Sequence, residues 1–515
     1  MDGLILFELV LAMLLAAVAL HYLANRLGIP PAAALIIGGG ALAFVPGEPA
    51  ISLEPELVLV LFLPPLLMDG AWVIPLRHLR RHLVGILSLA IGAVVFTTAV
   101  VALVTHMLMP GLPWAACAVL GAIVSAPDAI SARAVLQRVQ LPPRLAILLE
   151  GESLLNDAAA LVLFRIAVAA AVTGAFNAFD AVGDFVLVAL GGVAVGAVMG
   201  ALWVFIAKRM RDEYLITALT ALTCWGTFLL AERLQVSGVI ATVVAGLVCG
   251  WYQHVVLSAA VRVRSLSFWH VMIFLLEASV FILIGFELRE VIERAGGLHV
   301  VLDQMAEPTF WILLALTLAR VVWVFFSDAI TWLCHRLGRL RIQSIGWRGS
   351  TVLSWAGMRG VATLAVALSV PDEMPGRDFI VVASFAVILV TVLLQGTTLG
   401  FVIRRLRPPG TGSHVAALTL ADAQAALAEV QAKLVEQRAT GPDGVLLHSE
   451  LLESYRRCAS RIKSYSEDQE AHRLKRQAHL DLKLEAIAAA RTELLRLHRS
   501  GQIDDHVLYE LERNL

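Results

Sequence analysis

The feature that most constrains this chain is a series of long apolar stretches that fills its first four hundred residues. About 20 apolar residues cross a bilayer as an α-helix. Of the 515 residues, 59% are hydrophobic and only 16% are charged, which excludes a disordered chain, a coiled coil and an ordinary soluble enzyme. The sequence therefore predicts an all-α polytopic membrane protein that is embedded in the lipid bilayer.

We place thirteen transmembrane helices on this rule. They run over residues 4–23, 30–46, 55–75, 82–109, 113–139, 145–172, 181–207, 214–232, 236–253, 266–288, 308–334, 350–370 and 378–403. The first stretch has no basic segment before it and no small-residue cleavage site, so we interpret it as a retained span and not as a signal peptide.

Basic residues are distributed unevenly between the predicted loops. Loops after odd-numbered spans carry 18 lysines and arginines, whereas loops after even-numbered spans carry four. Because lysine and arginine concentrate in cytoplasmic loops, we expect the N-terminus outside and the C-terminus in the cytoplasm. An odd number of spans agrees with this orientation.

Hydropathy falls after a linker rich in proline and glycine at residues 406–413. The transmembrane domain then comprises residues 1–405. Residues 414–515 are rich in Ala, Leu, Glu, Gln and Arg with helical periodicity, which predicts a cytoplasmic helical C-terminal domain for docking or dimer support. We find no nucleotide or metal motif there, and the five scattered cysteines contain no CxxC pair that would indicate a zinc site.

Ionisable residues also occur inside the predicted spans, where each one is costly and is therefore a candidate for function. Eight of them lie in six spans: Asp69, Asp128, Asp157, Arg165, Glu277, Arg320, Asp328 and Arg359. Two or three could be structural pairs, but eight are too many to face lipid by accident. We interpret Glu277 and Arg320 as entrance or core charges.

Two spans carry helix breakers beside these charges. Pro127 precedes Asp128 in the fifth span, and a proline removes an amide donor and frees carbonyl groups that can bind a cation. In the twelfth span Gly357 and Gly360 bracket Arg359. If spans 1–6 and 8–13 are similar units, the two breaks occupy equivalent positions. Paired interrupted helices of this kind predict a secondary transporter with inverted repeats.

The sixth span carries two polar stripes. Residues four apart share a helix face, so Ser153 and Asp157 form one stripe and Glu152 and Asn156 form its neighbour. We assign the first stripe to ion binding, facing Asp128, and we count Asn156 of the second stripe and Pro127 among the candidate ion- or proton-binding residues.

The second stripe is expected to face the twelfth span. Arg359 could pair there with Glu152, because a buried carboxylate needs a partner and the arginine fork fits one. Glu150 lies two turns, roughly 10 Å, on the cytoplasmic side of Asp157. We expect Glu150 to line a negative inner funnel; a charge at the membrane interface, where the helix starts, is an equally open alternative.

Competition at one site would then provide the mechanism. A monovalent cation binds several oxygens, here the Na+ ligands Asp157, Asp128 and Ser153 together with carbonyl groups near Pro127. Burial beside a second carboxylate favours a bound proton. Asp157 then holds either a proton or a cation, and exchange results if the binding unit crosses only when it is occupied. No cofactor is required.

The segment from Glu150 to Asp157, Glu-Gly-Glu-Ser-Leu-Leu-Asn-Asp, resembles the signature of family 1 of the monovalent cation:proton antiporters, the bacterial NhaP-type Na+/H+ exchangers. Residues 63–70, 125–128, 281–285 and 357–360 fit the same family. The resemblance covers residues 1 to about 405. It implies thirteen spans, a six-helix core domain, a dimerisation domain and a homodimer.

The resemblance also implies roles for individual residues. Asp157 would be the essential carrier of ion and proton, Asp128 would assist it, and Glu152 would pair with Arg359. Asn156 directly before Asp157 looks like the electroneutral class, which exchanges one cation per proton.

The favoured function is a Na+ (or Li+)/H+ antiporter of a bacterial inner membrane that serves pH homeostasis, with no nucleic-acid partner. A K+/H+ antiporter on the same scaffold stays open, because Pro127-Asp128-Ala129 stands where many members have Thr-Asp-Pro. A cation channel would need a repeated carbonyl filter, and we find none. An intramembrane hydrolase is disfavoured because Gly151-Glu-Ser153 is not a nucleophile elbow.

Overall fold

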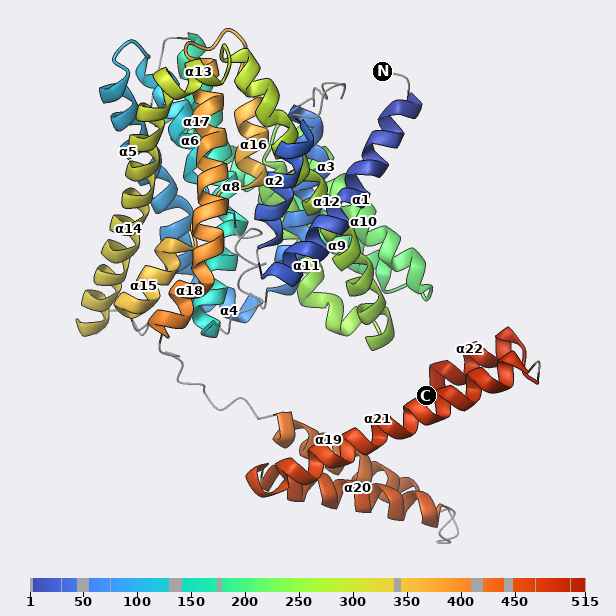
Figure 1. Ribbon diagram of the computed structural model, residues 1–515. Coiled ribbons are helices and arrows are strands. Elements are labelled where there is room, and N and C mark those ends of the chain that lie inside the picture. The colour runs from blue at the N-terminus through green and yellow to red at the C-terminus, as the bar shows by residue number, and fades with distance from the viewer. Residues whose placement is uncertain are drawn as a thin grey trace. The chain divides into compact units, whose positions relative to one another are not determined.

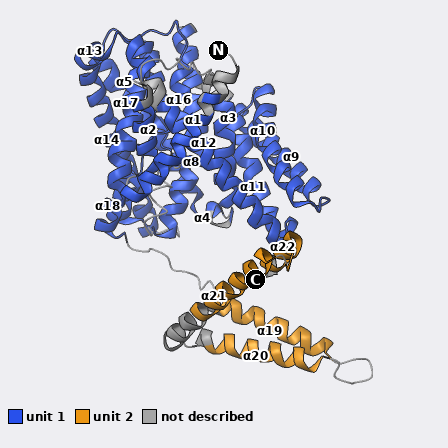
Figure 2. Ribbon diagram, turned by 45° about the vertical axis from the view of Figure 1, so that its right-hand side comes forward, with its two compact units in different colours: residues 1–412 blue, residues 413–515 orange. Residues whose placement is uncertain are grey.

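The computed structural model divides into two compact units, residues 1–412 and residues 413–515 (Figure 2). It describes residues 3–28, 30–43, 55–74, 76–128, 141–173, 178–337, 344–408, 420–439, 448–467, 469–500 and 502–514. Within these ranges every regular element is a helix, in agreement with the predicted fold class.

The first unit contains two groups of helices (Figure 1). We call one group the flanking bundle. It consists of α1 (Gly3–Leu27), α2 (Pro31–Ala43), α3 (Pro55–Val73), α9 (Ala178–Ala207), α10 (Glu213–Arg233), α11 (Gly238–Val256) and α12 (Ala259–Arg294). In this bundle α11 packs against α9, α3 and α10, and α2 packs against α12.

We call the other group the crossover bundle. It consists of α4 (Leu76–Leu87), η1 (Ser88–Ala93), α5 (Val94–Leu108), α6 (Trp114–Ser125), α8 (Pro143–Thr173), α13 (Leu298–Val300), η2 (Val301–Met305), α14 (Ala306–Arg336), α15 (Gly346–Trp355), α16 (Val361–Leu368), α17 (Arg377–Val390), η3 (Thr391–Gln395) and α18 (Gly396–Leu406). The η elements are short π-helical turns inside longer helices. α6 packs between α5 and α8, and α16 contacts α3 of the flanking bundle.

Small residues allow the helices of the flanking bundle to approach closely. Gly192, Gly196 and Gly200 lie along α9, and a side chain at any of them would overlap atoms of α11 or of the residue before it. Such rows of small residues are typical of helix pairs in membranes, where packing and not the hydrophobic effect holds helices together.

Eight helical stretches of the described residues are long and apolar enough to cross a membrane. Four shorter apolar helices occur as well, at Leu11–Leu27, Pro31–Ala41, Leu59–Val73 and Trp114–Ser125. Helices occupy part of each of the thirteen predicted spans, but thirteen membrane crossings remain a prediction. The end of the predicted fifth span, after Asp128, lies outside the described residues.

The second unit is helical, as the composition of the tail predicts. It consists of α19 (Leu420–Arg438), α20 (Ser449–Glu467), α21 (Gln469–Arg499) and α22 (Asp505–Asn514). α19 packs against α20, and an ion pair between Arg491 and Glu512, 3.0 Å long, joins α21 to α22.

Candidate functional site

The two predicted helix breaks are present and meet each other. α6 ends at Ser125, two residues before Pro127, because proline disfavours a helical conformation in the residue before it. α15 ends at Trp355, and α16 starts only at Val361. The backbone N–H of Asp128 donates to the carbonyl of Met358 at 2.6 Å. We call the two touching segments, residues 125–128 and 356–360, the crossover.

Arg359 is 2% exposed and holds the crossover together through backbone oxygens. Its Nε donates to the carbonyl of Val124 at 2.8 Å, and its terminal nitrogens donate to the carbonyls of Ser125 and Gly357. Its own backbone N–H donates to Oγ1 of Thr391 at 3.1 Å. Since the last carbonyls of a helix lack partners and carry its negative end, Arg359 caps the end of α6.

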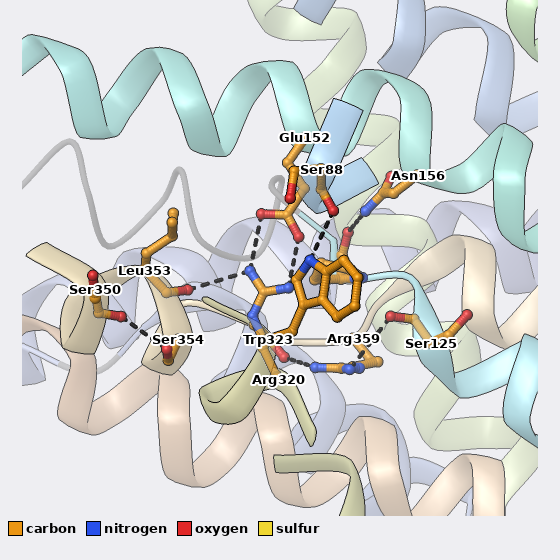
Figure 3. A network of polar contacts seen from close by, with 12 residues as sticks. Ser88, Ser125, Glu152, Asn156, Arg320, Trp323, Ser350, Leu353, Ser354 and Arg359 are labelled. Carbon is orange, nitrogen blue, oxygen red and sulfur yellow. Dashed lines mark hydrogen bonds and ion pairs between the residues drawn. The ribbon is translucent and has the colours of Figure 1, made fainter. Parts of the chain in front are cut away.

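Glu152 pairs with Arg320 and not with Arg359. The two oxygens of Glu152 accept from the two terminal nitrogens of Arg320 at 2.6 and 3.0 Å, and one of these nitrogens also donates to the carbonyl of Leu353 (Figure 3). Both residues are at most 3% exposed. The predicted Glu152–Arg359 pair is therefore wrong, because α14 brings Arg320 to this face of α8 while the helix-end carbonyls already occupy Arg359.

The two glycines of the second break leave room for two charged side chains. A Cβ atom at Gly357 would overlap the side chain of Arg320, and a Cβ atom at Gly360 would overlap the carboxylate of Asp128. Glycine at both positions leaves room for these side chains, which would have to shift if a Cβ atom were present.

Asn156 connects α8 to the first break. Its Nδ2 donates to the carbonyl of Pro127 at 2.6 Å, and the side chain is fully buried. Its Oδ1 has no hydrogen-bond partner in the described part of the chain. Glu152 and Asn156 thus share one face of α8, as their spacing predicts, and this face contacts both Arg320 and the crossover.

Asp157 and Asp128 are close enough to repel each other electrostatically. Asp157 follows Asn156 on α8, and Ser153 lies one turn earlier; both Asp157 and Ser153 are partly exposed. Asp128 is also partly exposed and lies against Gly360. The structure therefore places the carboxylate of Asp157, on α8, near the carboxylate of Asp128, which belongs to the crossover.

The other predicted candidates lie at varying distances from the crossover. Glu150 lies two turns before Asp157 on α8 and is partly exposed, so its role in a funnel stays a prediction. Glu277 lies on α12 in the flanking bundle. Arg320 is buried in the core of the bundle, which is one of the two positions predicted for it, an entrance or the core.

Two further charges inside predicted spans have structural roles. Asp328 accepts hydrogen bonds from the backbone N–H groups of Ile345 and Gly346, at 2.6 and 3.1 Å, and so caps the start of α15. Arg165 is exposed and pairs with Glu232 of α10 at 3.1 Å.

Sequence reasoning missed two polar contacts of the crossover bundle. Thr391 accepts from the backbone of Arg359, and Nε1 of Trp323 donates to the carbonyl of Ser88 at 2.9 Å, which joins α14 to η1. A lone threonine or tryptophan in an apolar span carries no signal, and both contacts involve π-helical turns that spacing rules do not predict.

The described residues contain no group of three or more His, Cys, Asp or Glu side chains arranged to hold a metal ion. The oxygen atoms near the crossover belong to the carboxylates of Asp128 and Asp157 and to the carbonyl groups at the helix breaks.

Comparisons with known proteins place this chain among the transmembrane sodium/hydrogen exchangers. Residues 10–405 match the family model described as sodium/hydrogen exchanger, transmembrane. An uncharacterised Na+/H+ exchanger of Mycobacterium tuberculosis is 32% identical over 99% of this chain and 95% of its own length. A sodium, potassium, lithium and rubidium/H+ antiporter of Bacillus subtilis is 32% identical over 76% of this chain and 60% of its own length. The solved structure of a sodium proton antiporter of Methanocaldococcus jannaschii has a similar fold, with a TM-score of 0.63, 20% identity, and coverage of 79% of this chain and 99% of that one.

Proposed function

Because this chain belongs to the sodium/hydrogen exchanger family, we propose that it exchanges Na+ (or Li+) for H+ across a membrane by competition of the two ions for Asp157. The proposed ligands for the cation are Asp157, Asp128 and Ser153, together with carbonyl oxygens of the crossover.

The observation that carries this proposal is the balance of charge around the crossover. Arg320 and Arg359 contribute two positive charges, and Glu152, Asp128 and Asp157 contribute three negative ones when all are ionised. The Glu152–Arg320 pair is internally neutral. One negative charge therefore remains, and a single bound proton or a single bound Na+ cancels it.

Neutrality of the loaded site gives a physical reason for obligatory exchange. Moving an uncompensated charge through a low-dielectric environment is costly. The empty site would carry this charge, whereas the protonated site and the cation-bound site would not. The binding unit then crosses with either ion and is held back when it is empty.

The same balance favours electroneutral exchange of one cation per proton. Asn156 is an uncharged amide at the position beside Asp157, and it donates to the carbonyl of Pro127. It holds the first break against α8 without adding a second ionisable group. A further carboxylate there would leave room for a second positive charge.

We assign the moving unit to the crossover bundle. Both breaks, Asp157 and the Glu152–Arg320 pair belong to it, and hydrogen bonds fix these parts to each other. The flanking bundle would then be the static part and the surface for a homodimer. Thirteen membrane crossings, inverted repeats, a cytoplasmic C-terminal unit and a bacterial inner membrane with the N-terminus outside complete the proposal.

A K+/H+ antiporter on the same scaffold is the second candidate. The relative from Bacillus subtilis carries potassium as well as sodium in its name. The fifth span also lacks the threonine hydroxyl next to Asp128, and fewer fixed oxygen ligands favour a larger and less strongly hydrated ion. Exchange assays with Na+, Li+ and K+ in parallel separate the two candidates.

The central test is Asp157→Asn in vesicles that contain a pH-sensitive dye. We expect addition of Na+ to cause no proton movement above background, because an amide cannot release a proton, while size-exclusion chromatography shows folded protein. Asp378→Asn, an exposed carboxylate at the start of α17, is the matched control and should exchange as the unmodified protein does. Full exchange by Asp157→Asn would reject the site.

A further inference from the structure

The start of α15 and the end of α18 lie at the same end of the crossover bundle (Figure 1), and a strongly basic pocket lies between them. It is open and has a volume of about 580 Å³. Its lining residues are Trp347, Arg348, Arg404, Arg405, Leu406 and Arg407. We call it the arginine pocket. It contributes nothing to the ion-exchange mechanism described above.

The four arginines of this pocket have no acidic partner among its lining residues. The lining contains no acidic side chain, and within the described residues none of the four forms an ion pair with a carboxylate. The sequence itself has no Asp or Glu between Asp328 and Asp372 or between Asp378 and Asp422. The chain segments on both sides of the pocket therefore cannot neutralise it.

The helix start at α15 is not the main source of the positive field. The carboxylate of Asp328 already accepts from the first two backbone N–H groups of that turn. The side chains supply the charge instead, and Arg348 stacks over the ring of Trp347 with 5.4 Å between its Cζ and the ring centroid. A guanidinium group held in this way is pre-positioned for a planar or tetrahedral oxyanion.

Large apolar side chains are exposed on the surface beside the pocket. Phe401 is 63% exposed and lies one turn before Arg405 on the same face of α18, and Leu394 on the preceding turns is 51% exposed. Trp347 is 60% exposed, and tryptophan is typical of the boundary between lipid and water. Acyl chains fit the apolar stripe, and a charged headgroup fits the arginines.

We propose that the arginine pocket binds the phosphate headgroup of an anionic phospholipid from the leaflet that surrounds this end of the bundle. Basic pockets between membrane helices recognise such headgroups through charge and bidentate hydrogen bonds. A free phosphate ion shares this headgroup chemistry, but it would leave the exposed stripe at Phe401 and Leu394 unused. The lipid anchors the crossover bundle, so lipid composition becomes a regulator of its movement.

The test uses the full-length protein in detergent and measures binding of dioleoyl phosphatidylglycerol by native mass spectrometry. The variant carries Arg404→Gln and Arg405→Gln together. Each arginine near an anionic headgroup contributes enough that loss of both should weaken binding roughly 30-fold. Arg348→Gln alone should weaken it about fivefold. Phosphatidylcholine, whose headgroup carries no net charge, should bind the unmodified protein and the double variant equally well.

The matched control removes two exposed arginines outside the pocket, Arg209→Gln and Arg211→Gln, and should bind phosphatidylglycerol within about twofold of the unmodified protein. An equal loss in this control would overturn the proposal, since general surface charge would then explain binding. Unchanged binding by the Arg404/Arg405 double variant and by Arg348→Gln would overturn it too. Displacement of the lipid by millimolar inorganic phosphate would reassign the pocket to a free anion.

Discussion

The two faces of α8 hold carboxylates under opposite conditions. On one face Glu152 makes a two-pronged ion pair with Arg320 and is almost completely buried. On the other face, five residues further along, Asp157 is partly exposed and lies near Asp128, a group of the same sign. The first carboxylate is neutralised by the protein, whereas the second must be neutralised by something that the protein does not supply.

This difference separates a structural charge from an exchangeable one within two turns of one helix. In an ion pair between buried side chains, the carboxylate charge is already neutralised, so the carboxylate does not attract a further cation. A carboxylate beside another carboxylate binds a proton or a metal cation readily, and it releases either one when the other replaces it. The predictions below test whether the two faces differ in this way.

The largest expected effect is on stability. Glu152→Gln leaves the guanidinium of Arg320 buried without its counter-charge and should lower the free energy of unfolding by about 3–5 kcal/mol. Asp157→Asn removes one of two like charges and should leave stability unchanged or raise it. Thermal unfolding followed by fluorescence-detected size-exclusion chromatography compares the two variants directly.

A second substitution on the same face provides the control. Combining Glu152→Gln with Arg320→Gln removes both charges, so it should recover part of the lost stability. If Asp157→Asn destabilises the protein as much as Glu152→Gln does, the two faces are equivalent and the comparison fails.

Arg359→Gln should have the next largest effect, a loss of about 2–3 kcal/mol, because hydrogen bonds from a charged donor to the carbonyls at the end of α6 are lost. Glu152→Gln should not rescue this variant, since Arg359 is held by backbone oxygens and not by Glu152. The same unfolding assay applies to the single and double variants. Rescue by Glu152→Gln would show that Arg359 belongs to the charged pair after all.

The smallest effect concerns the second face alone. Gly360→Ala places a methyl group where the carboxylate of Asp128 lies and should raise the Na+ concentration for half-maximal exchange about tenfold, with little change in stability. Gly226→Ala on α10 is the control, because a methyl group there meets no atom within 4 Å. An unchanged Na+ response in Gly360→Ala would argue against Asp128 as a ligand.

The helix breaks could be predicted from the sequence because their causes are local. Pro127 ends α6 through its own ring and missing amide, and the glycines near Arg359 weaken a helix wherever it packs. Most of the helical pattern follows from apolar stretches for the same reason. Element boundaries and the number of membrane crossings are less certain from sequence, because several apolar helices are short.

The partner of Glu152 could not be predicted in this way. The predicted spans contain several arginines, among them Arg165, Arg320 and Arg359, and composition does not show which of them pairs with Glu152. The choice depends on how α14 packs against α8 and on which carbonyls are left free at the end of α6, and both are properties of the assembled bundle. The sequence also does not predict that Asp328 caps a helix, because an aspartate in an apolar span has the same sequence pattern whether it binds an ion or caps a helix.

The π-helical turn η3 has a geometric consequence for the last helix of the first unit. Each residue of an α-helix advances the side chains by about 100°, and a π-turn accommodates one extra residue. The wide turn between Thr391, which supports Arg359, and Arg404 and Arg405 at the other end therefore holds one residue more than an α-helical turn without rotating the arginines. Deletion of a single residue within 392–395 would convert it to an α-helical turn, and the terminal arginines would keep their side of the bundle.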